Sequence, residues 1–203
     1  MKRVAITGGL ASGKTSVAHF FAKCGAVVVS ADAVVHKLLS PHTPLGQQII
    51  LLLGPDIVAQ GQFDRSKIAH KVFSDRELLD KYEMLLHPVI RKEIAAALDE
   101  AEKASSAPLL FAEVPLLYEA GMAEDYDYVI AVQAPEAACI TRFTERTGYG
   151  ADEFHRRSSR LLPAKEIAER ADLVINNTGS LEELENTVAS SYYRLCDILN
   201  PSH

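Results

Sequence analysis

The sequence predicts an α/β fold of three layers, in which helices cover both faces of a five-stranded parallel sheet. Three observations support this prediction. Short apolar runs alternate with longer helical segments along the 203 residues. Most of these runs are continuously hydrophobic, which is typical of strands that are buried on both faces. A glycine-rich segment follows the first run directly, and the chain is long enough for one domain with a sizeable insertion.

The predicted strands are short apolar runs. The first strand leads into the glycine-rich segment. Gly25, just before the second strand, is a natural cap for the end of the first helix, which is predicted over residues 15–23. The strands are predicted at residues 2–7, 26–30, 108–114, 128–133 and 173–176.

The segment after the first strand fits the pattern Gly-x4-Gly-Lys-Thr and precedes a helical pattern. Glycines permit a backbone path that turns successive N–H groups toward a phosphate chain. The helix N-terminus adds partial positive charge, Lys14 can reach the β- and γ-phosphates, and the Thr15 hydroxyl can ligate Mg²⁺. The alternative is a glycine-rich turn that happens to precede a helix. The predicted nucleotide-binding residues of this segment are Gly8, Gly9, Leu10, Ala11, Ser12, Gly13, Lys14, Thr15 and Ser16.

Residues 31–107, between the second and third strands, look almost wholly helical. This segment is too long for a simple crossover, so we expect a helical subdomain. A capping box at residues 74–77 (SDRE) predicts the start of its long helix, which Pro88 should kink or interrupt near His87. A second capping box at residues 180–183 (SLEE) predicts a C-terminal helix that runs to about Leu199.

A further helical segment, residues 135–170, joins the fourth and fifth strands and is rich in arginine. Glycines at 148 and 150 interrupt it, so that it can act as a movable lid. Arg142 and Arg146 are one helical turn apart and should face the same way. Paired arginines on a lid are what phosphoryl transfer needs to neutralise charge on the γ-phosphate. Because acidic residues are interleaved with the arginines, an ordinary solvated face is the alternative.

Two carboxylates follow predicted strands, at the edge where open α/β sheets bind their ligands. Asp32 comes just after the second strand. It could accept a proton from a substrate hydroxyl or help to hold Mg²⁺, or it could simply cap a helix over residues 33–39. Glu113 ends the third strand, where an acidic residue often serves Mg²⁺ through water, although a solvated glutamate is the alternative.

For two further polar residues, the sequence leaves more than one role open. His87 could be a core histidine or a hydrogen-bonding group at a helix end. Asn177 follows the last strand and could be a turn residue or a hydrogen-bonding contact to a base.

The composition limits the classes of partner. A net charge of −6 argues against a general nucleic-acid binder. No apolar run approaches the ~20 residues that cross a bilayer, and no signal peptide is evident, so we expect a cytoplasmic protein with no membrane attachment. The three cysteines and seven histidines form no zinc or disulfide pattern, so any metal should arrive with the nucleotide. The sequence leaves the oligomeric state open.

Several short motifs occur together in a characteristic order. Taken as a set, they resemble the dephospho-CoA kinase family, the P-loop enzymes of the last step of coenzyme A synthesis, across nearly the whole chain. Besides the lid pair Arg142 and Arg146, the matching segments are residues 6–18 (ITGGLASGKTSVA), 28–32 (VVSAD), 61–65 (GQFDR), 86–88 (LHP), 114–119 (VPLLYE) and 171–177 (ADLVINN). The chain departs from the family pattern at Ser30, Glu113, Leu161 and Asn176.

The resemblance implies a P-loop kinase fold and an ATP- and Mg²⁺-dependent phosphorylation of the ribose 3′-hydroxyl of dephospho-CoA, giving coenzyme A and ADP. It further implies three parts. Residues 1–30, 108–134 and 171–203 would form the nucleotide-binding core, residues 31–107 the acceptor-binding subdomain, and residues 135–170 the lid.

The resemblance also implies roles for single residues. Asp32 would be the general base, with Lys14 and Arg142 completing the catalytic set. Arg142 and Arg146 would close over the phosphates, and Asn177 would lie near adenine. Thr15 and Glu113 would serve the metal. The acceptor would be bound by Asp32, Arg65, His87, Pro115, Leu116 and Leu117.

Three other functions are alternatives to dephospho-CoA kinase activity. A different small-molecule or nucleotide kinase of the P-loop class would share the ATP site and change the acceptor pocket. A GTPase switch would need Asn-Lys-x-Asp and usually Asp-x-x-Gly, and the chain has neither. A nucleotide-binding subunit without catalysis is disfavoured by the intact Lys14 and Asp32.

Overall fold

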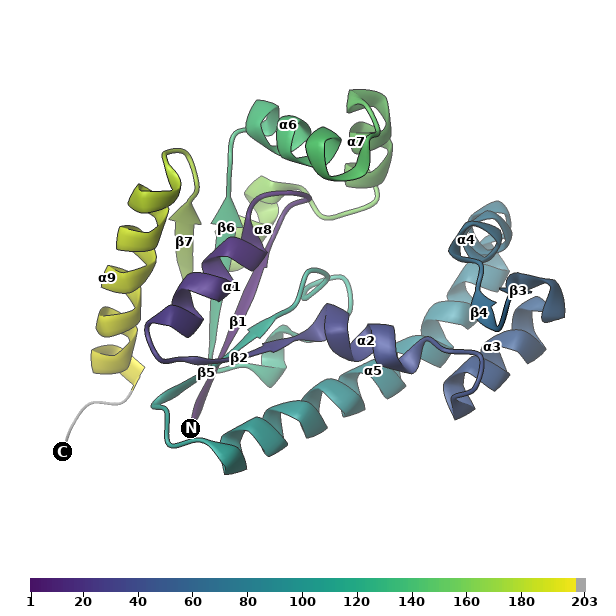
Figure 1. Cartoon of the computed structure of the whole chain (residues 1–203), viewed down its shortest axis with the longest axis horizontal. Helices are drawn as coiled ribbons and strands as arrows, with labels where there is room; N and C mark the ends of the chain where they lie inside the picture. Colours follow the sequence, from purple (N-terminus) through teal and green to yellow (C-terminus); the bar gives the residue numbers. More distant parts are fainter. Residues whose placement is uncertain (200–203) are drawn as a thin grey trace. The chain divides into compact units, whose positions relative to one another are not determined.

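The computed structural model describes residues 1–199, which divide into two compact units. The first unit comprises residues 1–31 and the chain from Leu98 onward. The second comprises residues 32–97. Figure 1 labels the helices and strands of both units.

The first unit is built on a parallel sheet with the strand order β2-β5-β1-β6-β7. Its centre is completely buried, since Val4, Ala5 and Ile6 of β1 are 0% exposed. The predicted five-stranded parallel sheet is therefore confirmed. The strands are β1 (Lys2–Gly8), β2 (Val27–Ser30), β5 (Leu109–Glu113), β6 (Tyr128–Gln133) and β7 (Leu173–Asn176).

Helices cover both faces of this sheet (Figure 1). On one face, α1 (Lys14–Lys23) packs beside α9 (Leu181–Leu199), and both contribute to the main apolar core. In that core the ring of Phe21 stacks on that of Phe111 with 4.2 Å between centroids. On the other face, α8 (Ala164–Arg170) lies against β1 and β6.

Two further helices follow β6 in the first unit. The first, α6 (Glu136–Thr147), ends at Gly148, whose φ of +75° suits glycine, and α7 (Ala151–Ser158) begins three residues later. The pair is held together by an edge-to-face contact between Phe143 and Phe154, with 5.7 Å between ring centroids. A short 3₁₀ turn, η2 (Ala123–Asp125), precedes β6.

The second unit is mainly helical and has an apolar core of its own, in which Ile49 and Ile57 are 0% exposed. A two-stranded hairpin interrupts the helices. The elements that lie in this unit or enter it are α2 (Ala31–Leu38), α3 (Pro44–Leu53), η1 (Pro55–Ile57), β3 (Val58–Ala59), β4 (Gln62–Phe63), α4 (Arg65–Ser74) and α5 (Arg76–Ala104).

The start of α5 corrects one capping prediction. Ser74 belongs to the last turn of α4, where its hydroxyl donates to the carbonyl of Lys71 at 3.0 Å. The cap of α5 is instead Asp75, whose Oδ1 accepts from the backbone N–H of Leu78 at 3.1 Å. The predicted box was therefore wrong by one residue, because the preceding helix already occupies Ser74.

The long helix also continues through Pro88, so of the two predicted outcomes, a kink or an interruption, the interruption is wrong. Proline removes the hydrogen bond to the carbonyl four residues earlier, which here belongs to Met84. Both residues lie on the exposed side of the helix, with Met84 75% exposed, so water can replace the lost bond. The helix consequently tolerates the proline.

The second capping box is confirmed. The backbone N–H of Glu183 donates to the Ser180 hydroxyl at 3.2 Å, and the Ser180 N–H donates to Glu183 Oε2 at 2.7 Å. This reciprocal pair opens α9.

Among residues 1–199, no helix is both long and apolar enough to cross a membrane.

Candidate active site

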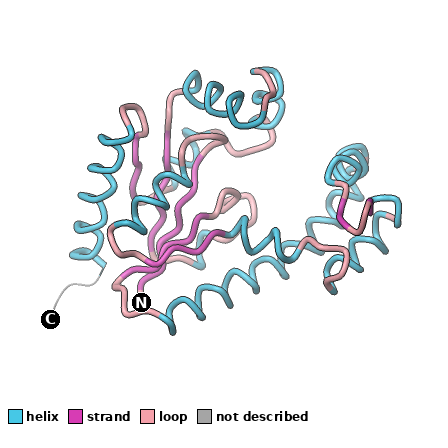
Figure 2. The backbone as a smooth tube through the Cα atoms, in the orientation of Figure 1, coloured by secondary structure: helices cyan, strands magenta, loops and turns pink. Residues whose placement is uncertain are grey.

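The loop between β1 and α1 follows a path that its glycines permit. Gly8 and Gly13 have φ values of +147° and +103°, and Ala11 is also at positive φ, +56°. A Cβ on Gly8 would collide with the carbonyl oxygen of Val132. This loop leaves the carboxyl end of the central strand and is drawn in pink in Figure 2. Its backbone can therefore wrap an anion in a way that larger residues would prevent.

Lys14 opens α1 and bends back over the loop. Its Nζ donates to the carbonyl oxygens of Gly8 at 3.0 Å and Gly9 at 2.9 Å. The ammonium group thus lies against the loop, next to the N-terminus of a helix that favours negative charge. This arrangement concentrates positive potential at one place.

Thr15, the next residue, contacts an acidic group from another strand. Its hydroxyl donates to Oε1 of Glu113 at 2.6 Å. Glu113 ends β5, pairs in register with Ile6 of the central strand and is only 8% exposed. Hydroxyl and carboxylate oxygens are the hard ligands that Mg²⁺ prefers.

These two residues do not form a metal cage by themselves. Within the part of the chain that the structure describes, no three His, Cys, Asp or Glu side chains gather closely enough to hold a metal ion. Mg²⁺ commonly binds through one or two protein groups together with substrate phosphates and water. The Thr15–Glu113 pair fits that mode.

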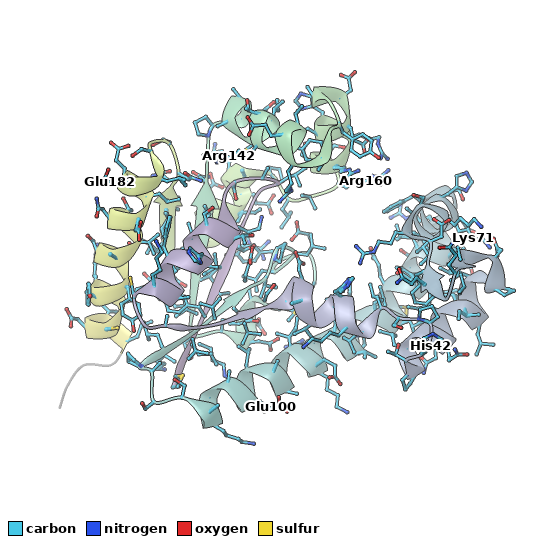
Figure 3. The ribbon with its side chains drawn as sticks, in the orientation of Figure 1. His42, Lys71, Glu100, Arg142, Arg160 and Glu182 are labelled. Carbon is cyan, nitrogen blue, oxygen red and sulfur yellow. The ribbon has the colours of Figure 1, made fainter. Side chains whose placement is uncertain are left out.

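Arg142 connects α6 to the phosphate loop (Figure 3). Its Nη1 lies 3.4 Å from the carbonyl oxygen of Ser12, and its Nη2 donates to Oδ1 of Asn177 at 3.3 Å. Asn177 in turn donates from Nδ2 to the same Ser12 carbonyl at 2.9 Å. A guanidinium group is therefore positioned beside the loop that carries Lys14.

Three other arginines of residues 135–170 have different surroundings. Arg146, one turn beyond Arg142, is exposed. Arg156 and Arg157 donate hydrogen bonds to Glu153 at 2.6 and 2.7 Å and lower the pKa of that carboxyl to about 2. For these two residues the solvated ion-pair reading fits the structure, so the arginines of this segment do not share one environment.

Contacts of Glu119 and Gln133 were missed by the sequence reasoning. Oε1 of Glu119 accepts from the backbone N–H of Leu162 at 2.9 Å, and Nε2 of Gln133 donates to the carbonyl of Ala164 at 3.0 Å. Both bonds hold the stretch that leads into α8. The available signal was the segment at residues 114–119, which carries Glu119 but does not reveal its partner.

A cavity of about 540 Å³ lies in the first unit. It is bounded by one side of the phosphate loop, the end of β6, α7 and the stretch before α8. Its lining residues include Gly9, Ser12, Gln133, Phe154 and Leu161.

In the second unit, Asp32 and Arg65 line one pocket of about 740 Å³. Asp32 is exposed and lies within the first turn of α2, which begins at Ala31, so its reading as a helix N-cap is wrong. The reason is that α2 follows β2 with no intervening residue. Nη2 of Arg65 lies 2.8 Å from Nδ1 of His36. Because a guanidinium group only donates, this nitrogen of His36 is the acceptor.

The rest of the pocket is mainly apolar. Its other side chains include Val35, Leu39, Phe63, Ile68, Val72, Phe73 and Tyr82. A volume of this size is typical of small-molecule sites, which combine an apolar lining with a few polar groups.

The other residues predicted to bind an acceptor are elsewhere. His87 is exposed on α5 and does not line this pocket, and its reading as a core histidine is wrong. Pro115, Leu116 and Leu117 belong to the first unit. Leu117 is 0% exposed, whereas Leu116 is 47% exposed. The side chain of Leu116 is thus accessible to a ligand, whereas that of Leu117 is not.

Comparison with known proteins identifies the family of this chain. The profile described as dephospho-CoA kinase matches residues 2–183. The chain belongs to the dephospho-CoA kinase family. It is therefore an enzyme of the kinase class, and this part of the sequence interpretation is confirmed.

Individual relatives support the assignment to the dephospho-CoA kinases. The chain is 42% identical over 193 residues to a protein named dephospho-CoA kinase from Chlamydia caviae, covering 95% of this chain and 96% of that relative. A crystal structure of TT1252 from Thermus thermophilus is 32% identical, covers 96% of this chain and 97% of its own, and superposes with a TM-score of 0.80.

The fold is also shared with a dephospho-CoA kinase from Campylobacter jejuni, at 24% identity and a TM-score of 0.71, covering 98% of this chain and all of that chain. The predicted three-layer P-loop kinase fold is thus confirmed for this member of the dephospho-CoA kinase family.

Proposed function

We propose that this protein transfers the γ-phosphoryl group of ATP to the ribose 3′-hydroxyl of dephospho-CoA, giving coenzyme A and ADP. One observation carries this proposal most directly. In a chain of the dephospho-CoA kinase family, Lys14, Thr15 with Glu113, and Arg142 all surround one glycine-rich loop. These are the parts that phosphoryl transfer requires.

The phosphate loop would bind the phosphates of ATP. Its backbone N–H groups and the N-terminus of α1 would offer hydrogen bonds and partial positive charge. Lys14 would exchange its bonds to the carbonyls of Gly8 and Gly9 for phosphate oxygens. Arg142, with exposed Arg146 beyond it, would add positive charge as the segment formed by α6 and α7 closes.

Thr15 and Glu113 would hold Mg²⁺, the first through its hydroxyl and the second directly or through water. When bound, the ion neutralises charge on the β- and γ-phosphates. This proposal is supported by the position of the two oxygen atoms, because the Thr15 hydroxyl lies 2.6 Å from Oε1 of Glu113.

The second unit would bind dephospho-CoA. The pocket lined by Asp32 and Arg65 offers an apolar wall for the uncharged arm of this substrate and a guanidinium group for its phosphates. Asp32 is the second residue after Ser30, whose backbone pairs in register with Glu113 at the edge of the sheet that carries the phosphate loop. This short distance along the chain supports Asp32 as the proposed base. His87, Pro115 and Leu116 remain proposed contacts to the acceptor.

The proposed reaction is an in-line displacement. A bond forms between the ribose 3′-oxygen and the γ-phosphorus, while the bond from that phosphorus to the β,γ-bridging oxygen breaks and ADP leaves. Asp32 accepts the proton of the hydroxyl. Lys14 and Arg142 stabilise the charge on the transferred group and the leaving oxygen. The remaining contribution is positioning of the two substrates and exclusion of water.

The decisive experiment offers purified protein ATP, Mg²⁺ and dephospho-CoA, and follows coenzyme A by mass spectrometry. We expect stoichiometric formation of coenzyme A and ADP, with no turnover when Mg²⁺ is chelated. Parallel reactions with nucleoside monophosphates test the competing P-loop kinase function. Phosphorylation of a monophosphate in preference to dephospho-CoA would overturn the proposal, as would ATP binding with no transfer at all.

A further inference from the structure

The loop after β7 places a buried amide beside the phosphate loop. Asn177 is only 5% exposed, although it directly follows a residue, Asn176, that is exposed. Its backbone N–H donates to the carbonyl of Gln133 at 2.7 Å, which fixes the position of its Cα. Its side-chain Nδ2 then donates to the carbonyl oxygen of Ser12 at 2.9 Å. The side chain is thus almost completely enclosed by protein.

The oxygen of the same amide contacts Arg142 of α6. Oδ1 of Asn177 accepts from Nη2 of Arg142 at 3.3 Å, and Nη1 of Arg142 lies 3.4 Å from the Ser12 carbonyl. Three groups therefore close a small hydrogen-bonded ring. They come from positions that are 35, 130 and 165 residues apart in the chain.

The fit against Gly13 shows how closely this amide packs. A Cβ built on Gly13 would collide with Nδ2 of Asn177. The asparagine thus occupies the space that any larger residue at position 13 would need. Gly13 also has a φ of +103°, so both the conformation and the neighbour require glycine.

We propose that Asn177 is a positioning residue for phosphoryl transfer, which sets the Ser12–Gly13 turn of the phosphate loop and the direction of Arg142. The proposal rests on the ATP-dependent function above. It replaces direct recognition of adenine as the main role of this side chain, because the residue is only 5% exposed and each end of its amide bonds to protein.

The planarity of the peptide group explains how the bond from Asn177 to the Ser12 carbonyl orients the whole Ser12–Gly13 peptide. In a trans peptide the C=O of Ser12 and the N–H of Gly13 point in opposite directions. By holding the carbonyl, Asn177 turns the Gly13 N–H to the opposite side of the loop backbone. Losing the bond frees this peptide to rotate. Rotation of this peptide also moves the Ser12 carbonyl away from Nη1 of Arg142, which removes one of the two contacts that hold this side chain.

The test compares kcat and kcat/KM for ATP and for ITP, which differ only in the base, in the wild type and in Asn177→Asp. The variant keeps the shape and the acceptor for Arg142 but removes the Nδ2 donor to Ser12. We expect kcat to fall by roughly 10–100-fold with both nucleotides, a loss typical of misplaced catalytic groups, and the ATP-to-ITP ratio to stay constant. Asn176→Ala is the matched control and should leave both rates unchanged.

A second variant separates positioning from a purely structural role. Asn177→Ala removes both contacts and should lower kcat further. Because Asn177→Asp places a carboxylate oxygen against the Ser12 carbonyl in a nearly buried position, thermal unfolding is measured for both variants, and kcat is compared at a temperature at which each variant is fully folded. A change in the ATP-to-ITP ratio with unchanged kcat for ITP would overturn the proposal in favour of base recognition. Unchanged kcat in both variants would overturn it as well. If the wild type makes no coenzyme A, the proposed function itself fails, and the two failures are thus distinguishable.

Discussion

The Thr15 hydroxyl donates a 2.6 Å hydrogen bond to Oε1 of Glu113 and thereby joins the start of α1 to the end of β5. The two residues are 98 positions apart in the chain. They meet because parallel strands place their carboxyl ends at one edge of the sheet, where ligands of open α/β sheets bind. A hydroxyl and a nearly buried carboxylate consequently form the oxygen pair that suits a hard cation.

Glu113→Gln should impair the use of Mg²⁺. The substitution keeps the shape of the side chain but removes its charge, so we expect about a 10–100-fold loss of activity at limiting Mg²⁺, partly recovered at high concentration. Initial rates over a Mg²⁺ titration measure this effect. The exposed Glu124 supplies the control Glu124→Gln, which should behave as the wild type. An unchanged Mg²⁺ dependence would exclude Glu113 from the metal site.

Asp32→Asn should slow transfer while leaving nucleotide binding intact. Loss of a general base typically lowers kcat by about 10²–10⁴-fold. Asp32 is exposed in the first turn of α2, so the substitution should cost little stability. Titration with ATP and steady-state kinetics separate the two effects. Asp80→Asn, which changes another exposed aspartate of the second unit, is the control. A variant with normal kcat would remove Asp32 from the role of base.

Gly13→Ala should weaken ATP binding more than its backbone conformation alone predicts. Gly13 and Gly121 both have positive φ, +103° and +62°, which costs a non-glycine residue about 1–3 kcal/mol. A Cβ on Gly121 meets open space, whereas one on Gly13 collides with Asn177. Calorimetric ATP binding and denaturant unfolding of Gly13→Ala and Gly121→Ala measure the difference. Equal effects in the two variants would mean that the collision has no consequence.

Tyr126→Phe should stabilise the protein, and more strongly at alkaline pH. The side chain is 9% exposed, and its buried hydroxyl has no hydrogen-bond partner among residues 1–199. Removing an unsatisfied polar group is expected to add about 1 kcal/mol to the free energy of unfolding near neutral pH.

The pH dependence follows from the direction of the pKa shift. Burial raises the pKa of Tyr126, so the folded state favours the neutral phenol. The contribution of the neutral Tyr126 phenol to the free energy of unfolding is fully present below the unfolded pKa of about 10. It is lost as the pH rises above that value, because only the unfolded chain ionises readily. Tyr126→Phe should therefore flatten the loss of stability above pH ~10. Tyr193→Phe, at a side chain that is 65% exposed, should leave the curve unchanged.

Local patterns were sufficient for most of the framework. Continuous apolar runs located the five strands, and the spacing of Ser180 and Glu183 located the start of α9, since both features depend on residues close in sequence. The same reasoning failed for the capping box at Ser74, because this residue belongs to the last turn of the preceding helix, α4. It also did not exclude a continuous helix at Pro88, where an exposed helix face tolerates a missing hydrogen bond that a buried one would not.

By itself, the sequence determined the phosphate loop, because the glycines at 8 and 13, Lys14 and Thr15 act through local backbone geometry. It also determined the parallel sheet and the family. Only the tertiary structure decided which of several similar side chains meet at the loop. Arg142 reaches Ser12 while Arg157 is bound to Glu153, and Asn177 is enclosed while Asn176 is exposed. The physical reason is that such contacts join residues distant in the chain, and their pairing depends on how the strands are ordered and covered.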